Sequence, residues 1–88
     1  MARREIRQIV DYIKIYDVVA ARHWFETLQE KCLTLSDAPN IGRIRTDLLP
    51  SLYMFPYGNY LIFYDIIPEG IQVIHVIHSA RDVGNATA

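Results

Sequence analysis

The side chains best suited to chemistry lie at the end of the last strand-like run and just beyond it. His78 and Arg81 both belong to residue types that serve in phosphoryl transfer. A histidine exchanges protons near neutral pH, and an arginine stabilises negative charge on a transferring phosphoryl group. Two arginines from an earlier segment complete the candidate set for a nuclease-like site, which is Arg43, Arg45, His78 and Arg81.

The same residues also suit a structural role, and the sequence leaves both interpretations open. Arg81 and Asp82 can fix the end of the strand, and the His78 ring can hydrogen-bond the backbone. Arg43 and Arg45 can simply be solvated.

Neither a metal site nor a cofactor site is predicted. His75 and His78 lie three residues apart on one strand, so their side chains point to opposite faces of the sheet. Cys32 is the only cysteine, which excludes an internal disulfide and leaves too few ligands for a zinc site. Its helical spacing predicts a small buried hydrophobic residue rather than a nucleophile.

Length and charge limit the class of protein. The 88 residues form one domain, 1–88, and a net charge of −1 gives no general attraction to DNA or to a membrane. No apolar run approaches the roughly 20 residues that span a bilayer, and charged residues follow Met1 almost at once. With its single cysteine, the chain is predicted to be cytoplasmic.

Two helices are predicted in the first half of the chain. In residues 2–16, apolar side chains recur at i, i+3, i+4 and i+7, and Asp17 is a good N-cap for a second helix from Val18 to Ser36. The short junction predicts an antiparallel helical hairpin. The apolar stripe of the second helix is Ala21, Trp24, Phe25, Leu28, Cys32 and Leu35, and we expect it in the core.

Three strands are predicted in the second half, at 52–57, 60–66 and 71–78. Gly58-Asn59 and Pro68-Glu69-Gly70 supply the turns between them, whereas residues 40–51 are predicted to be irregular. The order α-α-β-β-β predicts an α+β fold, with an N-terminal two-helix hairpin packed on a small antiparallel sheet.

The predicted sheet is apolar on both faces. On strand 60–66, Tyr60, Ile62 and Tyr64 alternate with Leu61 and Phe63. On strand 71–78, strict alternation places Ile71, Val73 and Ile77 opposite Ile74 and Val76. A sheet with one solvated face alternates with polar residues, so a partner is expected to cover the second face. The alternative is that tyrosine and β-branched residues face solvent, as they often do in sheets.

Taken together, these segments resemble the ParE branch of the RelE/ParE toxin superfamily of bacterial toxin–antitoxin modules. Each match is short, but the set follows the family's order and spacing over almost the whole chain. The matching segments are Ile9–Ile13, Ala20-Ala21, Pro39–Arg43, Phe55–Tyr57, Tyr60–Tyr64 and Val76–Asp82.

The resemblance implies a toxin that inhibits DNA gyrase by binding it, in a module of the kind that stabilises plasmids. It also implies a cognate antitoxin that folds onto the apolar sheet. Arg81 and Asp82 are then expected to contact the target. The expected antitoxin-binding residues are Tyr60, Ile62, Tyr64, Val73, His75 and Ile77.

Two alternatives follow from departures from the family pattern. A RelE-like ribosome-dependent mRNA endoribonuclease would use Arg43, Arg45, His78 and Arg81, but its usual basic residues are replaced in the central strand by Tyr60–Tyr64. The family's first strand does not precede the first helix here, which suggests a truncated, non-toxic member that only binds antitoxin. The unpaired sheet edge would also permit a homo-oligomer.

Overall fold

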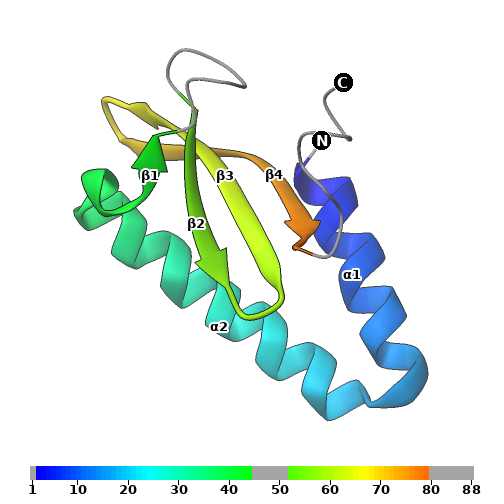
Figure 1. The fold of residues 1–88 in the computed structure, drawn as a ribbon. Coiled ribbons are helices and arrows are strands. Elements are labelled where there is room, and N and C mark those ends of the chain that lie inside the picture. Colours follow the sequence, from blue (N-terminus) through cyan, green and yellow to red (C-terminus); the bar gives the residue numbers. More distant parts are fainter. Residues whose placement is uncertain (1, 45–51, 80–88) are drawn as a thin grey trace, which may run out of the picture.

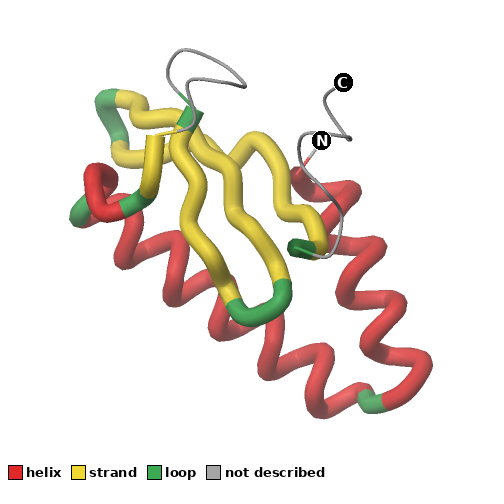
Figure 2. The backbone as a smooth tube through the Cα atoms, in the orientation of Figure 1, coloured by secondary structure: helices red, strands yellow, loops and turns green. Residues whose placement is uncertain are grey.

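The computed structural model describes residues 2–44 and 52–79, which form two helices followed by a four-stranded antiparallel sheet (Figure 1). The helices make one layer and the strands another (Figure 2). The α+β class predicted from the sequence is confirmed.

Both predicted helices form. Helix α1 spans Ala2–Tyr16 and helix α2 spans Val18–Asp37. Asp17 is the N-cap, because its side chain accepts a hydrogen bond from the Ala20 N–H at 3.1 Å. The two helices run in opposite directions and diverge away from their junction (Figure 1).

The segment after α2 is more regular than predicted. A short 3₁₀ helix, η1 (Pro39–Ile41), leads into strand β1 (Arg43–Ile44), which pairs with β2. The Tyr64 hydroxyl holds this segment, since it donates to the Pro39 carbonyl at 2.7 Å and accepts from the Gly42 N–H at 3.1 Å. A side chain at Gly42 would collide with that hydroxyl, so close approach explains the glycine here.

The three predicted strands are confirmed to within about a residue. They are β2 (Tyr53–Tyr57), β3 (Tyr60–Ile67) and β4 (Gly70–His78), in the order β1-β2-β3-β4. Gly58 takes a φ of +56° in the turn between β2 and β3, as a tight hairpin requires.

A β-bulge changes the faces of β4. Tyr64 pairs with Val73 while Phe63 pairs with His75, so Ile74 is an extra residue. As a result Val73 and Val76 share a face, and His75 and Ile77 lie on the other. This corrects the strict alternation assumed from the sequence, which placed Ile77 with Val73.

The core lies between the helices and one sheet face. Leu28 and Leu35 of α2 pack on Ile62 and Tyr64 of β3, both of which have 0% exposure. Phe63, on the opposite face, is also buried, at 2%. Its neighbours on that face, Leu61, His75 and Ile77, are half-buried.

Most of the exposed large apolar side chains lie on the helices. None of the residues of α1, all of which are described, is buried. The exposed apolar residues on the two helices are Tyr12, Ile15, Tyr16, Val18, Val19, Phe25 and Leu33. Among the described strand residues, Ile44 and Ile66 are also exposed, so the exposed apolar side chains are concentrated on the helices but not confined to them.

Candidate partner-binding groove

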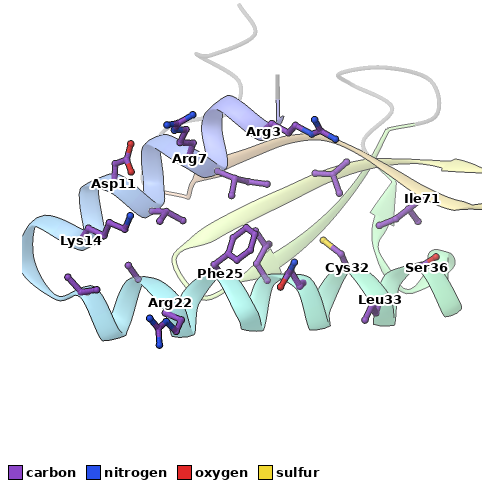
Figure 3. Close-up of a pocket in the computed structure, with 17 residues that line it drawn as sticks. Arg3, Arg7, Asp11, Lys14, Arg22, Phe25, Cys32, Leu33, Ser36 and Ile71 are labelled. Carbon is purple, nitrogen blue, oxygen red and sulfur yellow. The ribbon is translucent and has the colours of Figure 1, made fainter.

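A groove of about 1260 Å³ lies between α1, α2 and the first half of β4 (Figure 3). Each helix contributes residues at helical spacing, so one stripe of each faces the opening. Its lining is Arg3, Ile6, Arg7, Val10, Asp11, Lys14, Val18, Ala21, Arg22, Phe25, Leu28, Gln29, Cys32, Leu33, Ser36, Ile71 and Val73.

The interior of the groove is apolar. Leu28 and Val73 belong to its floor and connect it to the core. Phe25, 39% exposed, projects from α2 into the space between the helices (Figure 3). Ile6 is only half-buried and packs on the same core. An apolar ligand that fills the groove would therefore extend the core.

The rim of the groove is positively charged. Arg3, Arg7 and Lys14 line it from α1, and Arg22 lines it from α2, whereas Asp11 is the one acid in the described lining. The long stems of these cations can lie along apolar surface while their charged ends reach solvent. The groove therefore suits a ligand that is apolar on one side and acidic along its flanks.

Cys32 lines the groove and is half-buried. Burial raises the pKa of its thiol, so little of it is thiolate near neutral pH. This agrees with a packing role for Cys32 rather than a nucleophilic one.

Glu5 fastens α1 to the edge strand. Its Oε1 accepts a hydrogen bond from the Val76 N–H at 3.0 Å, and the His75 Nδ1 lies 3.0 Å from its Oε2. An ionised carboxylate only accepts hydrogen bonds, so a hydrogen bond here requires the His75 tautomer with its proton on Nδ1. Both contacts join α1 to the outer edge of β4, on the side of α1 away from the groove.

Comparison with protein families matches residues 1–83 to the ParE toxin of type II toxin–antitoxin system, parDE. The chain belongs to the ParE toxin family. No curated protein matched the chain. Family membership supports a role in a toxin–antitoxin module and an antitoxin partner.

The six residues expected to bind the antitoxin of this ParE-family chain do not form one surface. Ile62 and Tyr64 are fully buried under α2 and offer no surface to a partner. Val73 lies in the floor of the groove. Tyr60 and Ile77 line a second, smaller hollow on the other side of α1, and His75 contacts Glu5. The bulge and the covering helices separate them.

The candidate nuclease residues do not converge within the described chain. Arg43 lies on β1 and His78 at the end of β4, at opposite edges of the sheet. Three strand spacings of about 4.8 Å put these strands roughly 14 Å apart. Arg45, Arg81 and Asp82 lie outside the described residues.

Two further absences apply to the described residues alone. They contain no group of three histidine, cysteine or acidic side chains placed to hold a metal ion. Neither α1 nor α2 is both long and apolar enough to cross a bilayer.

The sequence contained a signal for the groove that the prediction did not use. Arg3, Arg7 and Lys14 fall on one side of α1, next to Ile6 and Val10, at spacings of three and four residues. Phe25 and Trp24 were both expected in the core. Trp24 packs on the core, whereas its neighbour Phe25 faces the groove.

Proposed function

We propose that the chain is the toxin of a type II module, that it inhibits DNA gyrase by binding, and that its antitoxin neutralises it by docking in the groove. The observation that carries the proposal is an apolar groove with a basic rim in a member of the ParE toxin family. A binding mechanism requires no catalytic groups, and the described candidates for catalysis lie at opposite edges of the sheet.

The occupant we propose for the groove is an amphipathic helix of the antitoxin. From Arg3 to Lys14 the groove wall of α1 is about 16 Å long at about 1.5 Å per residue, which matches about three helical turns. Apolar side chains at i, i+3, i+4 and i+7 of such a helix would meet Phe25 and Val73. Acidic residues at its flanks would meet the rim cations.

This docking mode also accounts for the incomplete burial of α1. Since no residue of α1 is buried, its apolar face is only half covered in the free chain. A docked helix would complete a three-helix layer on the sheet and bury Ile6 and Val10 more fully. Binding and stability would thus be coupled, and the free chain is expected to be the less stable form.

The target surface is a separate part of the proposal. Arg81 and Asp82 remain the proposed gyrase contacts, on the resemblance to the family alone. They follow β4, whereas the groove opens between the helices. The residues proposed for the target thus differ from those proposed for the antitoxin, and the antitoxin would act by blocking access or by holding the chain in another complex.

The test combines expression with two assays in parallel. The chain is induced in cells that lack the antitoxin, while DNA-damage signalling and mRNA cleavage are followed together, and purified gyrase is assayed for supercoiling. We expect growth arrest with DNA damage, inhibited supercoiling, and uncut mRNA on ribosomes. Wild-type cleavage of ribosome-bound mRNA with normal supercoiling would overturn the proposal and favour the endoribonuclease.

A groove variant separates the two halves of the proposal. Phe25→Asp should remain an inhibitor of gyrase but should no longer be neutralised by the antitoxin, since the change places a charge in the apolar groove. A Phe25→Asp protein that the antitoxin still neutralises would refute the docking site without refuting the target.

A further inference from the structure

A second hollow lies on the other side of α1, and neither part of the proposed function uses it. This aromatic cleft, of about 410 Å³, opens between α1 and the end of β4. Four of its residues come from α1 at i, i+3, i+4 and i+7, so they form one face of that helix. The lining is Glu5, Gln8, Ile9, Tyr12, Tyr60, Val76, Ile77 and His78.

Three of the residues that line the cleft carry aromatic rings, namely Tyr12, Tyr60 and His78. The Tyr60 ring lies 5.0 Å from the His78 ring and 5.2 Å from the Trp24 ring, in edge-to-face arrangements. Tyr12 is 58% exposed and packs on Tyr16 at 5.5 Å. Burial, and secondarily the nearby Tyr12, raises the pKa of Tyr60, so its ring stays a neutral phenol. Neutral aromatic faces attract either a cation or a stacked nucleobase.

Charge decides between these two ligands. Glu5 is the one carboxylate in the cleft, and no lysine or arginine is among its described lining. A nucleic-acid platform needs cations to hold the phosphates, and three of the four cations of α1, Arg3, Arg7 and Lys14, line the groove instead, while Arg4 lines neither hollow. A carboxylate beside aromatic rings attracts a positive charge, and a guanidinium can both stack on a ring and donate to a carboxylate.

We propose that the aromatic cleft binds the side chain of an arginine from a protein partner. The guanidinium would stack on Tyr12 or Tyr60 and donate a hydrogen bond to Glu5, whose oxygens are already positioned by His75 and the Val76 N–H. Such a site would fix the register of a partner on α1, independently of what fills the groove.

Trp24, the only tryptophan in the chain, reports on this site because its ring contacts Tyr60. We would titrate the protein with N-acetylargininamide and follow its fluorescence, with N-acetylcitrullinamide as the neutral isostere. A saturable change in the millimolar range is expected for the arginine compound, and none for the citrulline compound. Equal responses to the two compounds, or no response to either, would overturn the proposal.

Variants identify the site. Tyr12→Leu and Glu5→Gln should each weaken arginine binding by about tenfold, whereas Phe25→Leu, which alters the groove, should leave it unchanged. Both cleft variants keep the fold, since Tyr12 is exposed and glutamine retains an acceptor for the Val76 N–H. Arginine binding that survives both changes, or an oligonucleotide that binds through Tyr12, would contradict the assignment.

Discussion

The two sides of α1 have opposite chemistry. On one side, Arg3, Arg7 and Lys14 border a large apolar groove. On the other, Glu5 and Tyr12 face a small aromatic cleft at the edge of the sheet. A single 15-residue helix with no buried residue thus separates a surface suited to an acidic, apolar segment from one suited to a cation.

Helical spacing explains this difference, because it places the two sets of residues on opposite flanks of α1. Residues 3, 7 and 14 follow one line along α1, and residues 5, 8 and 12 follow another. Both lines border a core stripe that the sheet covers only in part. An ordinary amphipathic helix has one apolar face and one solvated face, whereas α1 also has two chemically distinct flanks.

The largest expected effect is on antitoxin affinity, when a carboxylate is placed in the groove on one side of α1 and, for comparison, in the aromatic cleft on the other side. Phe25→Asp should weaken antitoxin binding by at least about 100-fold, because it puts a carboxylate at the centre of an apolar contact. Tyr12→Asp, on the cleft side, should change it by less than about threefold. Calorimetric titration of both variants with the antitoxin measures their affinities. Equal losses of affinity would show that the two sides of α1 are not distinct.

The rim charges should act mainly on the rate of association. Arg7→Glu should slow antitoxin association by about tenfold at low salt, and the difference should fade near 0.5 M salt, where the Debye length is about 4 Å. Arg4→Glu is the matched control, because Arg4 lies on the same helix and is absent from the described lining of both hollows. Stopped-flow traces at two salt concentrations test this, and identical behaviour of the two variants would argue against a basic docking rim.

A smaller effect, on the stability of the protein, is expected where Glu5 joins α1 to β4. Glu5→Ala removes the acceptor for the Val76 N–H and the partner of His75, and should lower the free energy of unfolding by about 1–2 kcal/mol. Glu5→Gln should lose less stability, since the amide oxygen of glutamine can still accept the hydrogen bond from the Val76 N–H. Urea denaturation measures both, and an alanine variant as stable as wild type would show that Glu5 does not hold α1.

Sequence patterns predicted the elements whose signals are local. The periodicity of residues 2–16, the Asp17 cap and the Gly58-Asn59 turn each act within a few residues, and all three are confirmed. Strand β1 was missed because two residues show no alternation and depend on pairing with β2. The extra residue Ile74 was missed because alternation cannot reveal a bulge inside an apolar run.

The groove itself was not predicted from the sequence. An excess of apolar residues indicated a partner surface, and we assigned it to the sheet. Whether Phe25 faces the core or solvent depends on how far the two helices diverge, which is a tertiary property without a local signal. The burial of Ile62 and Tyr64 is likewise a tertiary property, because α2 covers both side chains.

Cys32 offers the most direct test of the central claim, which is that the antitoxin occupies the groove. It is the only cysteine and lies in the groove lining, and its raised pKa predicts slower alkylation than a free thiol, with a rate that increases with pH. The measurement is the iodoacetamide alkylation rate of Cys32 with and without saturating antitoxin. We predict that bound antitoxin slows it by about tenfold or more, because the reagent then reaches Cys32 only when the complex opens. An antitoxin that binds fully and leaves the alkylation rate unchanged would contradict the account.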